Sequence, residues 1–142
     1  MNKKKFTPIS KWGEFKLIDE LTKDVVINHK STKKGIGDDA AVLVNNNSNE
    51  QLISSDMLVE GVHFDATYTP LKHLGYKSIV VNISVIYSMN GLATHVTVCL
   101  GVPTKYSAEH ISELYEGIKM ACANYSIDLI GGDTTSSPTG LI

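Results

Sequence analysis

The sequence contains no arginine, and all thirteen of its basic residues are lysines. A protein that binds phosphate with this chain alone therefore lacks the guanidinium group, which pairs with phosphate through two parallel hydrogen bonds. Backbone amides, lysine charges or metal ions must act in its place. Cysteine is also scarce. Cys99 and Cys122 stand apart in apolar surroundings, which favours two buried thiols in a reducing compartment over a disulfide framework.

Long apolar stretches and a strong net charge are both missing. The longest apolar region, residues 78–89, is interrupted by three polar residues and is shorter than the roughly 18 residues that a membrane-spanning helix requires. The net charge is −2, which does not indicate a nucleic-acid or membrane-surface binder. Residues 1–12 form a basic N-terminal arm, and no apolar stretch of the signal-peptide type follows its lysines. We expect a cytoplasmic protein that binds neither nucleic acid nor membranes.

The chain has 142 residues, of which 42% are hydrophobic and 20% charged, as in an ordinary globular domain. Apolar spacing predicts helices over 14–26 and 70–90 and a third that begins after Ser107 and continues to Cys122. Residues 29–34 are polar and predict a loop.

Short β-branched or alternating runs predict four strands, at 40–44, 52–55, 96–102 and 127–130. The first two are joined by an asparagine-rich turn at 45–49, which predicts a β-hairpin with Asp39 and Asp56 at its open end. We expect an α+β fold, a mixed sheet with helices on one face. Residues 139–142 have the pattern of a further strand, so we expect the sequence to be part of a longer chain.

Carboxylates stand at the ends of three predicted elements, beside small residues. Asp38 and Asp39 follow Gly37, Asp56 follows two serines, and Asp133 follows two glycines. Each alone is typical of a turn-forming aspartate. Together, hard oxygen ligands from separate segments favour Mg²⁺, which in proteins often also binds the phosphates of a substrate.

Glycines near these carboxylates do not form a known phosphate-binding loop. The P-loop pattern G-x-x-x-x-G-K-[ST] is absent from the sequence. Residues 131–134, Gly-Gly-Asp-Thr, are able to form a nest of backbone amides around a phosphate, which on its own is a weak signal.

Four segments together resemble thiamine-monophosphate kinase, in that family's order and spacing. They are GIGDDAA at 35–41, SSDMLVEGVHF at 54–64, VNIS at 81–84 and LIGGDTT at 129–135. Gly-Asp-Asp and Gly-Gly-Asp also occur in related enzymes such as selenophosphate synthetase and aminoimidazole ribonucleotide synthetase. The stretch from Val59 to Phe64 is more specific to the kinase.

The resemblance implies the N-terminal domain of the aminoimidazole ribonucleotide synthetase-like superfamily, over residues 13–142. In the family a C-terminal domain completes the site, and the resemblance does not extend to it. The implied reaction transfers the γ-phosphoryl group of ATP to thiamine phosphate, giving thiamine diphosphate and ADP. A homodimer paired through its sheets, with the strand at 96–102 near the contact, is also implied.

The resemblance also implies roles for individual residues. Those that it places at several Mg²⁺ ions are Asp39, Ser54, Ser55, Asp56 and Asp133, with Asp38 as a further or indirect ligand. It places Gly132, Asp133 and Tyr115 at ATP, and His63 at thiamine phosphate. From the sequence alone, Tyr115 is equally well explained as a core aromatic on an amphipathic helix, and His63 as an ordinary loop histidine.

One residue departs from the family pattern. The family has aspartate after Asn-Leu-Ser, and this chain has Val85 after Asn82-Ile83-Ser84. Valine offers no oxygen to a cation, so the metal site is expected to be weakened. Two alternatives to the kinase therefore stay open, a non-catalytic dimerisation domain and another ATP-dependent synthetase of the same superfamily. The His63 loop argues against the synthetase.

Overall fold

The structure is a computed structural model that describes residues 7–45 and 49–142. Residues 1–6 of the predicted basic arm, with Lys3, Lys4 and Lys5, and the centre of the predicted turn at 45–49 lie outside the described residues. The elements, in chain order, are η1 (Ile9–Lys11), α1 (Gly13–Thr22), β1 (Thr32–Lys34), β2 (Ala41–Val44), β3 (Glu50–Ile53), α2 (Leu71–Ser88), β4 (His95–Val102), α3 (Ala108–Tyr125) and β5 (Asp128–Ser136).

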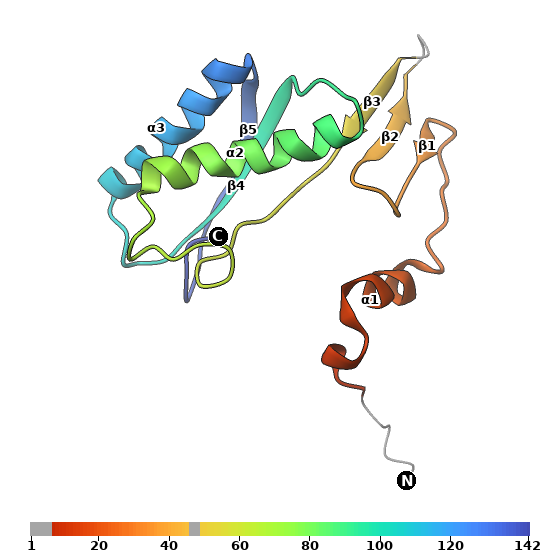
Figure 1. Ribbon diagram of the computed structural model, residues 1–142, viewed down its shortest axis with the longest axis horizontal. Coiled ribbons are helices and arrows are strands. Elements are labelled where there is room, and N and C mark those ends of the chain that lie inside the picture. The colour runs from red at the N-terminus through yellow and green to blue at the C-terminus, as the bar shows by residue number, and fades with distance from the viewer. Residues whose placement is uncertain (1–6, 46–48) are drawn as a thin grey trace.

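The strands form two sheets, an antiparallel one of order β1-β2-β3 and a parallel pair, β4 and β5, joined through α3. Helices α2 and α3 lie next to this pair (Figure 1). The α+β class expected from the sequence is confirmed, although the strands are divided between two sheets. The predicted hairpin is also confirmed, because Ala41 pairs with Ile53 and Val44 with Glu50. Its open end points toward Asp39 and Asp56.

The hydrophobic core lies between the two long helices and β4. Its most buried large side chains are Ile79 of α2, Ile118 of α3 and Leu141 near the end of the chain. In β4, Leu100 is buried and Val96 and Val98 pack against the core, whereas Thr97 and Cys99 are exposed. This alternation is the pattern of a strand with one covered face. The helices therefore cover one face of the parallel pair.

Two glycines allow α2 and α3 to cross at very short range. A Cβ atom at Gly75 would lie 1.9 Å from the carbonyl oxygen of Leu114, and one at Gly117 would lie 1.8 Å from that of Lys72. No side chain fits at such distances, so backbone meets backbone at this crossing. The relative position of the two helices is therefore fixed by these glycines.

The beginning of α3 is formed as the sequence predicts. Ser107 caps the helix, its hydroxyl accepting a hydrogen bond from the backbone N–H of His110, while the His110 ring accepts one from the Ser107 N–H. Two donors that helix geometry leaves without partners are thereby satisfied. At the other end, Ser126 adopts the left-handed conformation with φ of 55° and ends the helix.

The strand predicted over 127–130 is longer in the structure. β5 continues to Ser136, pairing with β4 along its whole length. Gly131 and Gly132 have positive φ values of 153° and 146°, and a Cβ at Gly132 would lie 1.8 Å from the carbonyl oxygen of Val98. The prediction that the strand ends at these glycines is wrong, because here glycine allows close strand pairing.

The N-terminal part also differs from the sequence prediction. Helix α1 ends at Thr22, and the following Val25 and Val26 are exposed. Adjacent β-branched residues lose side-chain freedom in a helix, and nothing packs on them here to compensate. Residues 32–34, predicted as loop, form the edge strand β1, whose lysines leave no apolar alternation to detect. Figure 1 shows α1 apart from the helices α2 and α3.

Residues 139–142 make strand-like hydrogen bonds without being part of a named strand. The N–H groups of Gly101 and Ile142 each donate to the other residue's carbonyl, at 2.9 and 3.0 Å. The carbonyl oxygen of Leu141 accepts a hydrogen bond of 2.9 Å from the backbone N–H of Glu60. The sequence pattern at 139–142 is therefore matched by pairing against β4 and residue 60.

The helix crossing yields a stability prediction. Gly75→Ala or Gly117→Ala should each lower the free energy of unfolding by about 3 kcal/mol or more, because backbone has to move to admit the methyl group. Ser112→Ala, on the exposed side of α3, should change it by less than about 0.5 kcal/mol. Urea denaturation of the three variants measures this. A glycine variant as stable as the Ser112 variant would contradict the close crossing.

Candidate functional site

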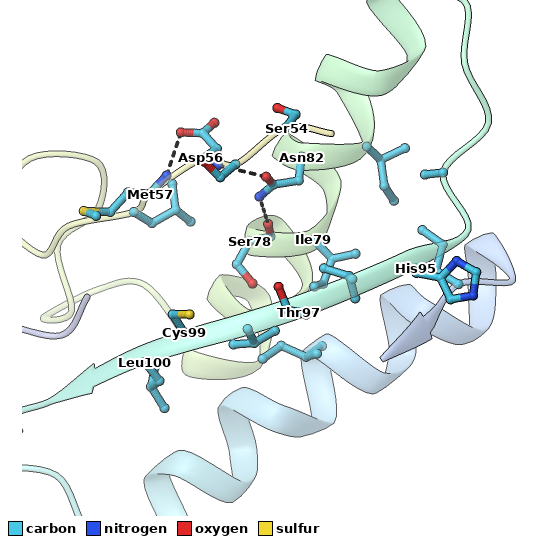
Figure 2. Close-up of a pocket in the computed structure, with 18 of the residues that line it drawn as sticks. Ser54, Asp56, Met57, Ser78, Ile79, Asn82, His95, Thr97, Cys99 and Leu100 are labelled. Atoms are coloured by element: carbon cyan, nitrogen blue, oxygen red, sulfur yellow. Dashed lines mark hydrogen bonds between the residues drawn. The ribbon is translucent and has the colours of Figure 1, made fainter. Parts of the chain in front are cut away.

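A large cavity lies between α2, β4 and the segment that follows β3. Its volume is about 1240 Å³. The polar residues that line it include Ser54, Ser55, Asp56, Asn82 and Asp133. Figure 2 shows Asp56 and Asn82 side by side on one wall and the strand with Thr97 and Cys99 on the other. The cavity thus brings together segments that are far apart in the sequence.

Asn82 of α2 holds Asp56 in position. The Asn82 Oδ1 accepts a hydrogen bond from the backbone N–H of Asp56 at 3.0 Å, and its Nδ2 donates to the carbonyl oxygen of Ser78 at 3.0 Å. The Asp56 carboxylate accepts from the N–H of Met57 at 2.8 Å. Both ends of the amide are therefore used, which fixes the segment after β3 on the helix (Figure 2).

Asp38 and Asp39 line a second, smaller hollow of about 350 Å³, formed by residues 35–41 and 53–55. The Asp39 carboxylate accepts a hydrogen bond of 2.6 Å from the hydroxyl of Ser88, in the last turn of α2. Asp38 pairs with Lys34, and this bond, followed by one from the Asp39 N–H, lowers the pKa of Asp38. Asp38 therefore stays ionised in a site that already contains one positive charge.

Ser54 and Ser55 line both hollows. They therefore lie between Asp38 and Asp39 on one side and Asp56 on the other. Serine hydroxyl and carbonyl oxygens are hard ligands of the kind that Mg²⁺ binds. Their predicted role as Mg²⁺ ligands stays a prediction.

Val85 occupies the helix face between the two anchoring points. Asn82, Val85 and Ser88 are spaced three residues apart, which places them along one side of α2. Asn82 binds the Asp56 segment and Ser88 binds Asp39, while the Ser88 hydroxyl also lies 2.8 Å from the carbonyl oxygen of Val85. The position at which the resembling family has aspartate thus lies between the two acidic segments.

Asp133 is in the middle of β5 rather than at a strand end. It pairs with Cys99 of β4 and lines the large cavity together with Asp56. Because residues 131–134 belong to the strand, they do not form the nest of amides considered from the sequence. The glycine at 132 is explained by the close approach of Val98.

The three predicted carboxylates are divided between the two adjoining hollows. Asp56 and Asp133 line the large one, and Asp39 lines the small one. Across residues 7–45 and 49–142, no group of three or more His, Cys, Asp or Glu side chains is close enough together to hold a metal ion. The oxygen ligands have the right chemistry for Mg²⁺, but they do not form a complete site by themselves.

His63 is held in a tight loop with one ring nitrogen already in use. Its Nδ1 accepts a hydrogen bond of 3.0 Å from the N–H of Val59, and its own N–H donates to the Val59 carbonyl at 2.9 Å. Lys77 of α2 donates to the carbonyl oxygen of His63 at 3.1 Å. Because Nδ1 is an acceptor, the neutral ring carries its proton on Nε2. The loop therefore offers an N–H donor at an exposed position.

Tyr115 is half-buried on α3 and packs against the hydrophobic core. This contact favours the core interpretation that the sequence left open, and it supplies no observation for a nucleotide contact. The predicted role of Tyr115 at ATP stays a prediction.

Glu60 is a half-buried charge that the sequence analysis did not single out. Its side chain is 15% exposed and accepts hydrogen bonds from the N–H of Leu141 at 2.8 Å, from Lys105 and from the hydroxyl of Tyr106 at 3.5 Å. The Lys105 bond is the main cause of the lowered pKa of Glu60, and the same bond raises the pKa of Lys105. In the sequence, Glu60 could have been noticed as a single charged residue between Val59 on one side and Gly61 and Val62 on the other.

Comparison with known proteins identifies the class. The family model described as AIR synthase related protein, N-terminal domain, matches residues 37–142. The chain belongs to this family. None of the helices in the described part of the chain is long and apolar enough to cross a membrane.

The names of individual relatives describe one kind of enzyme, which the description of the family model does not. Thiamine-monophosphate kinase of Bacillus subtilis is 40% identical over 129 residues, which cover 91% of this chain and 39% of the relative. A solved structure described as AaThiL complexed with AMPPCP and TMP has a TM-score of 0.83 at 29% identity, over 96% of this chain and 41% of that one. Thiamine monophosphate kinase of Aquifex aeolicus has a TM-score of 0.70 at 25% identity, over 95% and 41%. The chain thus spans about two fifths of the length of these proteins.

The bonds of Glu60 with Leu141, Lys105 and Tyr106, here called the Glu60 cluster, lead to a prediction for the pH dependence of stability. The pKa of Glu60 is lower in the folded chain, so its contribution to stability is complete above its ordinary pKa of 4.5 and is lost as the pH falls below that value. We expect Glu60→Gln to destabilise the protein at pH 7 and to reduce the further loss of stability between about pH 5 and pH 3.

Urea denaturation at several pH values measures both effects. Glu113→Gln is the matched control, because Glu113 is exposed on α3 and the same charge is removed. Equal pH slopes for wild type and the Glu60 variant would show that the cluster does not stabilise the fold.

Proposed function

We propose that the full-length protein transfers the γ-phosphoryl group of ATP to thiamine phosphate, giving thiamine diphosphate and ADP, as a step of thiamine diphosphate biosynthesis. The observation that carries this proposal is the match to a solved structure described as complexed with AMPPCP and TMP, over 96% of this chain at a TM-score of 0.83. AMPPCP is an analogue of ATP, and we take TMP to stand for thiamine monophosphate. The matched region contains both hollows and the His63 loop.

The site residues are assigned roles within this proposal. Asp39, Asp56 and Asp133 would hold Mg²⁺ ions, with Ser54 and Ser55 supplying further oxygens and Asp38 assisting. When bound, Mg²⁺ would neutralise the phosphate charges of ATP and polarise the transferred group. Gly132 and Tyr115 would lie near the nucleotide. His63 would donate its Nε2 proton in a hydrogen bond to thiamine phosphate.

The residue set supports direct transfer without a covalent enzyme intermediate. Phosphoryl transfer depends on positioning and charge neutralisation more than on a protein nucleophile. Asn82 and Ser88 supply positioning, because each fixes one of the acidic segments on the rigid helix α2. The lack of arginine leaves charge neutralisation to cations and to residues outside this chain.

A second candidate function is a domain that dimerises without catalysing the reaction. Val85 favours it, because this apolar residue stands on α2 between Asn82 and Ser88, which bind the two acidic segments, where the resembling family has a carboxylate. The remaining alternative, another ATP-dependent synthetase of the superfamily, is disfavoured by the names of the relatives and by the His63 loop.

We also propose that residues 13–142 form the N-terminal domain of a cytoplasmic homodimer whose second domain completes the substrate sites. Ile53, Leu92 and Ile130 are exposed by 50%, 77% and 63% and all line the large cavity beside β4. Apolar side chains in this position are typical of a surface that another chain covers.

Val85 is the most direct test of the proposed activity. In the full-length protein, Val85→Asp should strengthen Mg²⁺-dependent ATP binding and raise the rate of thiamine diphosphate formation by about 10²–10³, the usual effect of one group in an electrostatically organised site. The assay measures thiamine diphosphate formed by full-length protein and by residues 1–142, each with and without the substitution. Both short forms should be inactive because the second domain is missing.

Ser84→Asp is the matched control, because it adds the same charge to the adjacent, exposed face of α2. It should leave the rate within about twofold of wild type, as expected for an exposed charge. Equal activity of the two full-length forms would show that the carboxylate at 85 is dispensable. Full activity of the unmodified short chain would contradict both the metal argument and the need for a second domain.

The assembly proposal is tested by sedimentation. We expect the chain to sediment as a dimer at micromolar concentration, and Leu92→Asp to shift it toward monomer because a charge cannot be buried unpaired at an apolar contact. Tyr68→Asp, a change at an exposed residue outside the cavity walls, should leave the dimer intact. A monomer for the unmodified chain would contradict the proposal.

A further inference from the structure

The loop that carries His63 begins at Glu60 and ends at Phe64. These two residues form a β-bridge, and the N–H of Gly61 donates to the carbonyl oxygen of Phe64 at 2.8 Å. Phe64 is part of the hydrophobic core, so this end of the loop is anchored by burial. At the other end, the anchor is the side chain and backbone of Glu60.

Glu60 binds both polar backbone groups of Leu141. The N–H of Glu60 donates to the Leu141 carbonyl at 2.9 Å, and the Leu141 N–H donates to Oε2 of Glu60 at 2.8 Å. Leu141 is itself 2% exposed. A segment far along the chain therefore serves as a rigid support for the start of the His63 loop.

The turn between β4 and α3 supplies the second support. Lys105 donates to Oε1 of Glu60, and the Tyr106 hydroxyl lies 3.5 Å from Oε2. The other charged group facing Lys105 is Asp65, which belongs to the same loop region as His63 and whose carboxylate accepts from Thr67. One carboxylate thus joins three segments, the start of the His63 loop, residue 141 and the turn between β4 and α3.

We propose that Glu60 is a positioning residue for phosphate-ester recognition: by fixing Val59 and Gly61 it sets the direction of the His63 Nε2 proton. Glu60 is next to the residue that holds the His63 ring, because the N–H of the adjacent Val59 donates to His63 Nδ1 at 3.0 Å. This inference rests on the proposed function, in which His63 contacts thiamine phosphate. It adds a residue that does not itself touch the substrate.

Two measurements on the full-length protein test the inference. The first is the ¹⁵N chemical shifts of the His63 ring, which report its tautomer and need no activity; the His63→Gln variant assigns the signals. The second is steady-state kinetics with thiamine phosphate and ATP varied separately. Glu60→Gln should change the His63 signals and raise KM for thiamine phosphate by about ten- to a hundredfold, as expected for disturbing a hydrogen bond to a charged group. The KM for ATP should stay unchanged.

Three further variants make the test specific. Glu113→Gln removes an exposed carboxylate on α3 and should change neither measurement. Adding Lys105→Met to Glu60→Gln removes the cation left without its partner and should restore part of the affinity for thiamine phosphate. If Glu60→Gln does not fold, Lys105→Met alone should still change the His63 signals while leaving the Leu141 bond in place.

The outcomes separate the inference from the function on which it rests. Unchanged His63 signals in both the Glu60 and Lys105 variants, or an unchanged KM for thiamine phosphate in a folded Glu60 variant, would overturn the positioning role. If His63→Gln binds thiamine phosphate as tightly as wild type, the proposed substrate contact of His63 fails instead, whatever the Glu60 variant does.

Discussion

The backbone contact between α2 and α3 at Gly75 and Gly117 is the constraint on which the site depends. It lets α2 lie close to α3 and keep one side directed at the large cavity. Asn82 and Ser88 of α2 bind the two acidic segments, and Lys77 of the same helix binds the His63 loop. A shift of α2 by even a few tenths of an ångström would act on all three segments together.

Two contacts join the hairpin to the C-terminal end of α2 and the residues that follow it. Ser88 binds Asp39 at the hairpin's open end, and Leu52 lies against Gly91, where an added Cβ would come within 2.4 Å of its side chain. Between these points the hairpin and β4 both line the cavity without pairing. The small hollow that contains Asp39 therefore depends on a polar contact more than on the hydrophobic core.

The sequence predicted those elements whose pattern runs over several turns or pairs. Helices α2 and α3 and strand β4 have long apolar periodicity, and Ser107 is a clear cap, so their positions were correct within a few residues. Strand β1 was missed because an edge strand of threonine and lysine has no apolar alternation. The length of β5 was missed because Gly131 and Gly132 resemble a turn, while their actual function is close pairing with β4.

For the site, local motifs were informative and long-range partners were not. The residues of the Ser-Ser-Asp and Gly-Asp-Asp motifs do lie around adjoining hollows. The contacts of Asp39 with Ser88 and of Glu60 with Leu141 join residues 49 and 81 positions apart, and the second partner of each pair, Ser88 or Leu141, belongs to no local motif. Such pairs are fixed by tertiary packing, which a single sequence does not specify.

In the described part of the chain, the lysines near the acidic motif and the His63 loop are already bound to other groups. Lys34, the lysine closest to the acidic motif, is paired with Asp38, and Lys105 is paired with Glu60. Lys77 is bound to a backbone carbonyl. Arginine is absent from the sequence, so no guanidinium group of this chain pairs with the phosphates, and the proposed function relies on metal ions held by the carboxylates. Within the proposed function, the missing carboxylate at position 85 of α2 leaves one ligand fewer for these cations, so we expect the apolar residue there to affect the chemistry more than its size suggests.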